Sequence, residues 1–280
     1  YAHSGDLMSL YYGFMNENKN LFPQSVIDKV GKLRTYDISE GSKLNELQTA
    51  ISDYVSSLGS DEELKFNNEV QNRATEYFKK HKRDLTKTDI VKIGLSNFSV
   101  EAMGGIPGKL LNQFSLDEYS GHLRAAVTVG DSMGMGFGGE RSEDENDVYV
   151  LDANLNVSGS VIGLGQNERI YSARFIEDKA YLVTFRQTDP FYVIDLKNPK
   201  QPKMVGELKI PGFSSYLHPI TKDLILGVGM EGSKVKISLF DVSNPSKPTE
   251  VSKYSLDEYW TEVSNNHHAF LQDSKHKVFF

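Results

Sequence analysis

The chain has 280 residues, of which 39% are hydrophobic and 25% charged, as in a soluble globular protein. Its formal net charge of −7 argues against a nucleic-acid groove, which normally carries an excess of Lys and Arg. Disulfides and thiolate chemistry are excluded because there is no cysteine, and no apolar run reaches the roughly 20 residues of a transmembrane helix. The chain starts at Tyr1 without a signal peptide and stops at Phe280 in a predicted strand, so we expect both ends to be cut.

The first predicted strand runs from Leu33 to Asp37, where apolar and aromatic residues end on an aspartate. Residues 42–85 instead show helical spacing, because apolar residues recur every three or four positions from Leu44 to Leu58. A second helix begins at Ser60, where a capping box opens an acidic first turn. We therefore predict a helical hairpin over residues 42–85, inserted between strands. Two roles are open for it: docking a partner, or covering the neighbouring sheets.

A glycine- and acid-rich segment extends from Gly130 to Asp147. It contains a literal G-x-G-x-x-G at 134–139, and a second match lies at 227–232, but neither opens a helix whose N-terminus could meet a pyrophosphate. Because carboxylate oxygens suit calcium, the acidic residues of this segment are weak candidates for its ligands: Glu143, Asp144, Glu145 and Asp147. The segment lacks the fixed alternation of a dedicated calcium loop, so a solvated loop is the competing interpretation.

A repeat sets the predicted architecture. An apolar strand that ends on aspartate occurs at Asp37, Asp152, Asp195 and Asp241, and the last two aspartates are each followed by an Asn-Pro turn. The last three lie 43 and 46 residues apart, and the helical insertion accounts for the longer first interval. Within one period, four strands separated by turns can be assigned: Ile170–Ile176, Ala180–Phe185, Phe191–Leu196 and Met204–Ile210.

A period in the forties with four strands is typical of a propeller blade. The sequence therefore predicts an all-β propeller of four-stranded antiparallel blades over residues 1–280, forming an incomplete ring, with the helical hairpin inserted at 42–85. The repeated aspartates could be metal ligands or catalytic groups. A turn role is favoured, because an aspartate at a strand end can accept hydrogen bonds from backbone amides two residues further on.

Three residues are candidates for ligand binding. Arg174 lies on the first strand of its blade, the strand that lines the central channel of a propeller, while Arg186 and Asp189 lie in a loop between strands. These side chains could bind an anion or a peptide carboxylate. An Arg–Asp ion pair that organises the loop is the competing interpretation.

No recognised reaction centre is present. The sequence has neither an H-E-x-x-H metal motif nor a G-x-S-x-G nucleophile elbow. His267 and His268 precede the strand-like run Ala269–Leu271. If the strand continues through them, the pair could not bind one metal ion, because adjacent side chains on a strand point to opposite faces; ordinary packing or exposure is the favoured interpretation.

Two glycosylation sequons occur, Asn97-Phe98-Ser99 and Asn156-Val157-Ser158. Such short motifs also arise by chance, so they give weak support for export.

The long stretch IYSARFIEDKAYLVTFRQTDPFYVIDL at 170–196, with GELKIPGFSSYLHP at 206–219 and LNQFSLDEY at 111–119, resembles the secreted β-propeller domain family of archaea and some bacteria. This family is distantly related to WD-type repeats. The resemblance implies export and often a membrane or cell-wall anchor, which would lie outside this chain. It implies no particular reaction, because the family supplies no established catalytic residues to transfer.

We therefore expect an extracellular or cell-surface binding module without catalytic activity, whose partner is a protein, a peptide or a glycan and not nucleic acid. No cofactor is expected, with calcium as the open exception. One alternative is a hydrolase or lyase at the channel mouth, which would need converging carboxylates or a His–carboxylate pair. The other is a calcium-stabilised surface scaffold.

Overall fold

The computed structural model describes residues 2–4, 6–130, 144–185 and 189–280. The chain divides into two compact units, which we call the helical unit (residues 2–87) and the blade unit (residues 88–129 and 144–280). The helical unit contains a short strand and five helices: β1 (Ala2–Ser4), α1 (Leu7–Glu17), α2 (Gln24–Leu33), α3 (Glu40–Ser56), α4 (Ser60–Lys80) and α5 (Lys82–Leu85). None of the helices in the described part of the chain combines the length and the hydropathy that crossing a membrane requires.

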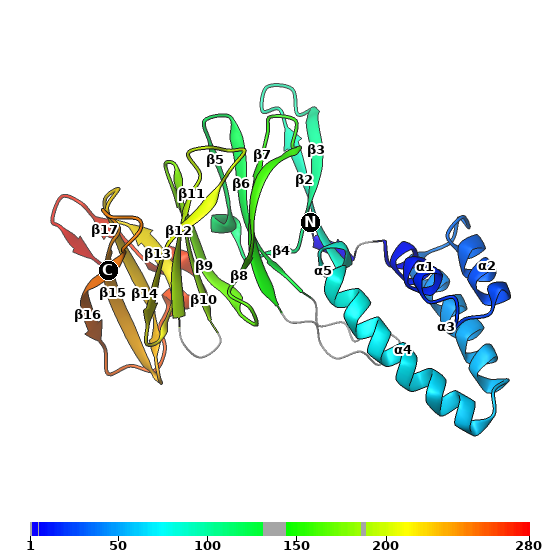
Figure 1. The fold of residues 1–280 in the computed structure, drawn as a ribbon. Helices are drawn as coiled ribbons and strands as arrows, with labels where there is room; N and C mark the ends of the chain where they lie inside the picture. Colours follow the sequence, from blue (N-terminus) through cyan, green and yellow to red (C-terminus); the bar gives the residue numbers. More distant parts are fainter. Residues whose placement is uncertain (1, 5, 131–143, 186–188) are drawn as a thin grey trace. The chain divides into compact units, whose positions relative to one another are not determined.

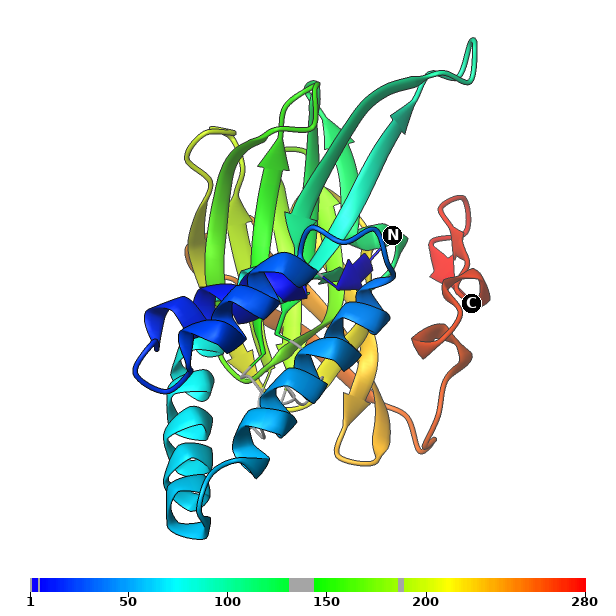
Figure 2. The same ribbon diagram turned by 90° about the vertical axis from the view of Figure 1, so that its right-hand side faces the viewer.

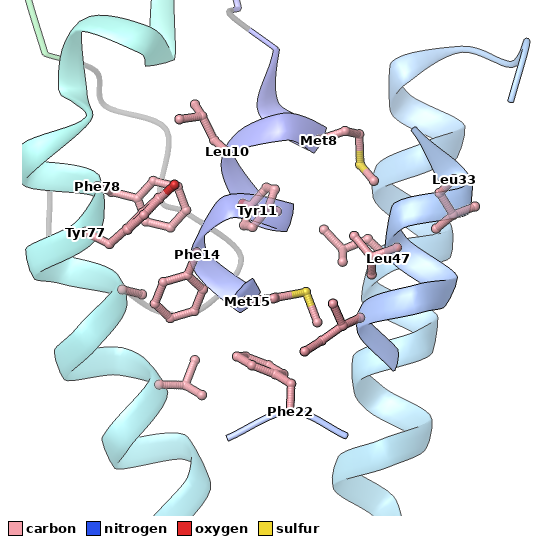
Figure 3. Packing of buried hydrophobic residues seen from close by; sticks show 14 of the residues in the cluster. Met8, Leu10, Tyr11, Phe14, Met15, Phe22, Leu33, Leu47, Tyr77 and Phe78 are labelled. Atoms are coloured by element: carbon pink, nitrogen blue, oxygen red, sulfur yellow. The ribbon is translucent and has the colours of Figure 1, made fainter. Parts of the chain in front are cut away.

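Aromatic side chains hold the helical unit together. Phe14 of α1 is completely buried, and its ring lies 5.9 Å from that of Phe22 and 5.5 Å from that of Tyr77, measured between centroids. Figure 3 shows these rings between α1 and α4, with Met8, Met15 and Leu47 filling the space towards α2 and α3. The apolar faces of α1, α2, α3 and α4, together with Leu85 of α5, therefore share one core.

The helical segment is larger than the sequence pattern indicated. Helices α3, α4 and α5 correspond to the hairpin predicted at 42–85, but α1 and α2 precede it. The predicted strand Leu33–Asp37 is wrong, since Leu33 is the last residue of α2. Ile27, Val30 and Leu33 recur every three residues and are all buried, so helical packing, not a blade strand, determines this segment.

The blade unit consists of antiparallel sheets that follow one another along the chain (Figure 1). A hairpin of β2 (Thr86–Ile93) and β3 (Val100–Pro107) comes first. Blade 1 contains β4 (Lys109–Leu110), β5 (Leu116–Tyr119), β6 (His122–Val129), β7 (Glu145–Leu151) and β8 (Val157–Leu164). Blade 2 contains β9 (Arg169–Ile176), β10 (Lys179–Phe185), β11 (Asp189–Asp195) and β12 (Lys203–Ile210). Blade 3 contains β13 (Phe213–Pro219), β14 (Leu224–Glu231), β15 (Lys234–Asp241) and β16 (Thr249–Ser255).

The chain after blade 3 contains two short 3₁₀ helices and a two-stranded sheet: η2 (Glu262–Ser264), η3 (His267–Ala269), β17 (Gln272–Asp273) and β18 (Val278–Phe279). The four-stranded antiparallel blades confirm the predicted fold class.

Both faces of blade 2 are buried, and strand alternation divides its side chains between its two neighbours. On β10, Ala180 and Leu182 belong to the core shared with blade 1, whereas Tyr181 and Val183 belong to the core shared with blade 3. Adjacent residues of a strand point to opposite faces, so a strand with two buried faces is apolar along its length. This explains why β10 reads as a continuous hydrophobic run.

Successive blades come into backbone contact at glycines. A Cβ atom on Gly206 of β12 would lie 2.0 Å from the carbonyl oxygen of Pro245, in the Asn-Pro turn of blade 3. The equivalent distance is 2.5 Å from Gly159 of β8 to the carbonyl oxygen of Pro199, in blade 2. Only a residue without Cβ permits this approach, so these strand glycines are packing residues.

The repeated aspartates close turns. Asp152 accepts hydrogen bonds from the backbone amides of Asn154 and Asn156, each at 2.9 Å, and Asp241 accepts one from Ser243 at 2.9 Å. The bonds from Asn156 hold the pKa of Asp152 below its ordinary value, and those from Ser243 do the same for Asp241. The predicted turn role is therefore confirmed for Asp152 and Asp241, whereas Asp37 follows α2 and not a blade strand.

Replacing Gly206 by Ala should destabilise the blade unit, because the added methyl group would force the two backbones apart. We expect a loss of roughly 1–3 kcal/mol in the free energy of unfolding, the usual effect of overpacking. The matched control is Gly105→Ala in β3, where the nearest atom to the new Cβ is a side-chain oxygen at 3.4 Å. Urea unfolding followed by circular dichroism measures both; equal midpoints for the two variants would contradict the packing role of Gly206.

Replacing Phe14 by Ala should destabilise the helical unit by about 3–5 kcal/mol, since a completely buried ring leaves a cavity when it is removed. Leu64→Ala is the control, because Leu64 lies on α4 with 63% of its surface exposed. The helical circular dichroism signal during thermal unfolding reports on both variants. A Phe14 variant that melts together with the Leu64 variant would show that the aromatic core is not needed.

Candidate functional site

The candidate site lies at the inner edge of the blade unit, where the first strands of successive blades meet. In blade 1 this strand is interrupted: β4 and β5 both pair with β6, and the 3₁₀ helix η1 (Gln113–Ser115) separates them. In blades 2 and 3 the first strands β9 and β13 are continuous and lie side by side. Asn112 caps η1 by accepting a hydrogen bond from the amide of Phe114 at 2.9 Å, which fixes the break.

A pocket of about 180 Å³ opens at this edge. We call it the inner-edge pocket. Its walls come from five segments of the blade unit, namely η1, β9, β13, η2 and η3. It is lined by Asn112, Gln113, Phe114, Ser172, Ala173, Ser215, Tyr216, Leu217, Val263, Ser264, Asn265 and His267. The lining therefore combines amide and hydroxyl groups with aromatic and aliphatic side chains, and no carboxylate is present among these described residues.

Arg174 does not line this pocket, but it contacts three residues that do. Its Nε donates to the carbonyl oxygen of Leu217 at 2.8 Å, which ties β9 to β13, and its guanidinium carbon lies 3.9 Å from the centroid of the Phe114 ring. The same carbon lies 5.4 Å from the Tyr216 ring. Burial lowers the pKa of Arg174, and its hydrogen bond and charge interaction with Tyr216 oppose that shift. Arg174 thus positions Phe114 and Tyr216, which line the pocket.

A hydrogen-bonded chain continues from Tyr216. Its hydroxyl lies 3.0 Å from Nδ1 of His218, and Nε2 of His218 lies 2.8 Å from Oε1 of Gln272. In the neutral ring, Nε2–H donates to Gln272 and Nδ1 accepts from the tyrosine. Phe270 packs on the His218 ring with centroids 4.6 Å apart. This arrangement anchors the segment after blade 3 to β13.

His267 lines the pocket directly. The amide of Gln113 donates to Nε2 of His267 at 3.0 Å, and the imidazole and the Phe114 ring form a T-shaped pair with centroids 4.9 Å apart. The strand-like conformation expected from Ala269 does not extend through His267 and His268, because all three residues form the 3₁₀ helix η3, capped by the Asn266 side chain. The two imidazoles consequently lie close together, with centroids 4.0 Å apart.

The other two predicted ligand-binding residues are placed only in part. Arg186 lies outside the described residues. Asp189 begins β11, where its backbone is opposite Ile210 of β12. Ligand binding by Arg174, Arg186 and Asp189 stays a prediction. Gln113, Asn265 and His267 carry no sequence signal, because two distant parts of the chain must meet before they form a wall.

The predicted calcium ligands are partly engaged within the fold. Glu143 lies outside the described residues, and Asp144 pairs with Arg169. Glu145 and Asp147 are buried on β7, and Asp147 accepts from the hydroxyl of Tyr149 at 2.8 Å and the amide of Gly163 at 2.9 Å. Among the described residues, no three His, Cys, Asp or Glu side chains are grouped so that they could hold a metal ion. Calcium binding stays a prediction.

A second pocket, of about 270 Å³, lies between the β2–β3 hairpin and blade 1. Its lining includes Ile90, Val91, Leu123 and Leu155, and its charged residues are Lys92, Glu118 and Asp152. Asp152 is committed to its turn and Lys92 pairs with Glu101 at 3.3 Å, which leaves Glu118 to orient a ligand. The inner-edge pocket, with hydrogen-bonding groups from five segments, is the better candidate.

A family model for the beta propeller domain matches residues 16–280. The chain belongs to the beta propeller domain family. This propeller chain is 50% identical over all of its 280 residues to an uncharacterized protein of Archaeoglobus fulgidus, covering 43% of that protein. It is 44% identical over 274 residues, 97% of the chain, to an uncharacterized protein of Methanocaldococcus jannaschii, again covering 43% of the relative. The propeller chain thus spans less than half the length of these relatives.

Among solved structures, the propeller chain is similar to cobalt-substituted Synechocystis ACO, with 10% identity and a TM-score of 0.40 over 62% of this chain and 42% of that one. A mutant of Synechocystis ACO gives 10% identity and a TM-score of 0.38, with the same coverage of both chains. Values this low carry no argument about the propeller's function.

Replacing Arg174 by Met should destabilise the propeller blades and disorder the pocket wall. The carbonyl of Leu217 would lose its donor and Phe114 its cationic neighbour, a loss of about 1–3 kcal/mol in the free energy of unfolding. The control is Arg169→Met on the same strand, because Arg169 is more than half exposed and pairs with Asp144 at the surface. Chemical unfolding compares the two; an Arg174 variant no less stable than the control would contradict the positioning role.

Proposed function

We propose that this chain is an extracellular or cell-surface binding module without catalytic activity, and that the inner-edge pocket binds a neutral, hydroxyl-rich ligand, such as one residue of a glycan. The observation that carries the proposal is the composition of the pocket wall. Its described polar groups are uncharged amides, hydroxyls and one imidazole, set beside aromatic rings.

The chemistry of these groups matches sugar hydroxyls. A hydroxyl both donates and accepts, and so does the side-chain amide of an Asn or Gln. Asn265 and Gln113 present such amides, and Phe114 and Tyr216 supply apolar surface beside them. The positive charge of Arg174 is turned towards Leu217 and the two rings, which favours a neutral ligand over an acidic peptide.

The size of the pocket limits what it can enclose. At about 180 Å³ it is smaller than the roughly 300–1,000 Å³ of pockets that bury a drug-sized molecule. A single residue, either terminal or within a longer chain, fits this volume better than a whole oligosaccharide. The rest of the ligand would lie along the exposed inner edge.

The extracellular or cell-surface location is part of the proposal. It is supported by the resemblance to secreted propellers and by the two sequons. The same resemblance implies a membrane or cell-wall anchor, which would lie in a segment outside these 280 residues. The alternative of a hydrolase or lyase would require converging carboxylates or a His–carboxylate pair in the pocket, and the described lining residues contain neither.

A glycan array probed with the purified chain tests the proposal, with a peptide array run in parallel. We expect selective binding to a set of glycans that share one residue, and a loss of roughly fivefold or more in affinity for Gln113→Ala, because one hydrogen bond is worth about 1 kcal/mol or more. Gln201→Ala is the matched control, since Gln201 is exposed in a blade turn.

Two results would overturn the proposal. One is binding that Gln113→Ala and Gln201→Ala affect equally, which would place the ligand elsewhere. The other is reproducible turnover of a substrate that a single substitution abolishes, which would make the chain an enzyme. Selective binding on the peptide array alone would transfer the binding role from glycans to peptides.

A further inference from the structure

The β2–β3 hairpin ends in an exposed turn that carries one of the two sequons. In Figure 2 the hairpin projects past the neighbouring strands of the blade unit. Its turn is closed by hydrogen bonds from the amide of Gly94 to the carbonyl of Ser99 at 2.9 Å and from the amide of Phe98 to the carbonyl of Gly94 at 2.8 Å. Asn97 is therefore held at the tip of a defined turn, open to an enzyme from outside.

The sequon side chains are already arranged within this turn. The Oδ1 atom of Asn97 accepts from the backbone amide of Ser99 at 3.1 Å and from its hydroxyl at 2.9 Å. The Nδ2 atom of Asn97 makes no hydrogen bond to any described residue. The nitrogen that glycosylation must modify is thus exposed, while the carbonyl of the same amide is polarised by the serine.

The second sequon lacks this arrangement. The Nδ2 atom of Asn156 donates to Oδ2 of Asp152 at 3.3 Å, and its backbone amide donates to Oδ1 of the same aspartate at 2.9 Å. Val157 and Ser158 already belong to β8, where Val157 is opposite Leu151 of β7. Asn156 is therefore tied to a blade turn, and Ser158 lies within β8 at an irregularity of its pairing with β7.

The surface of the hairpin near Asn97 carries exposed apolar side chains. Leu95 and Phe98 expose 88% and 81% of their surfaces, and Val100 and Met103 on β3 are also exposed. A cluster of apolar side chains on a projecting hairpin is an aggregation hazard in water. A glycan attached at Asn97 would cover part of it with hydroxyl groups.

We propose that Asn97 is an N-glycosylation site and that Asn156 is not, an inference that rests on the exported location in the proposed function. The co-reactant is an oligosaccharide linked to a lipid phosphate. A bond forms between Nδ2 of Asn97 and the anomeric carbon of the first sugar, and the bond from that carbon to the phosphate oxygen breaks. The oxygen leaves with the electron pair on the lipid phosphate, and one amide proton is lost to a base of the transferase.

The first experiment tests whether the geometry of the two sequons decides which asparagine is glycosylated. The 280-residue chain is expressed behind a cleavable secretory leader in a glycosylating eukaryotic host, and glycan occupancy is measured by peptide mass spectrometry before and after enzymatic deglycosylation. We expect occupancy at Asn97 that Asn97→Gln and Ser99→Ala abolish and Ser99→Thr retains. The matched variants Asn156→Gln and Ser158→Ala should leave the total glycan mass unchanged. An unmodified chain, or a glycan on Asn156 in place of Asn97, would overturn the assignment.

The second experiment examines the protein purified from the cells that make it. The peptide containing Asn97 should carry a glycan there, and an unmodified peptide would overturn the proposal for the native protein. Ligand binding by the pocket is measured on chain produced without glycosylation, so a failure there leaves these outcomes untouched. An unmodified Asn97 likewise leaves the array result standing.

Discussion

The close approach of each blade's turn to the last strand of the blade before it is the constraint on which the rest of the blade unit depends. The carbonyl oxygens of Pro199 and Pro245 reach positions that a Cβ on Gly159 or Gly206 would occupy. Gly104 of β3 meets the carbonyl of Leu155 in the same way, so the β2–β3 hairpin contacts blade 1 as each blade contacts the next. Once the backbones are this close, both faces of blade 2 are covered, and its middle strands must be apolar on both sides.

The site follows from places where this regularity stops. In a continuous first strand such as β9, the backbone groups form hydrogen bonds with the next strand of the sheet. Such a strand contributes only its own side chains to the inner edge. In blade 1 the strand breaks at η1, and the chain directly after blade 3 forms η2 and η3 before its next strand. Polar side chains on these short helices therefore lie beside β9 and β13 without being absorbed into a sheet. Arg174 holds the aromatic part of that wall in place from the buried side.

The sequence was informative wherever the determinants are local. The aspartate turns, the strands of blade 2 and helices α3 and α4 depend on residues a few positions apart, and all were predictable. The strand assigned to Leu33–Asp37 failed because its apolar residues match a blade repeat and also extend the helical spacing of Ile27 and Val30. The run after His268 failed because the Asn266 cap turns the chain into a 3₁₀ helix. No local pattern could bring Gln113 to His267, since that contact requires blades 1 to 3 to stack first.

The repeat and the function therefore occupy different residues. Some positions recur from blade to blade: the aspartates, the Asn-Pro turns and the strand glycines. Their side chains and backbone form the hydrogen bonds and packing contacts that any neighbouring pair of blades needs. A ligand can be recognised only by side chains that the scaffold does not use, and these lie where the chain departs from its period. Gln113 and Asn265 belong to such departures at the inner edge, and Asn97 belongs to one at the tip of the β2–β3 hairpin. For a propeller of this kind, the search for function is a search for the residues that break the repeat.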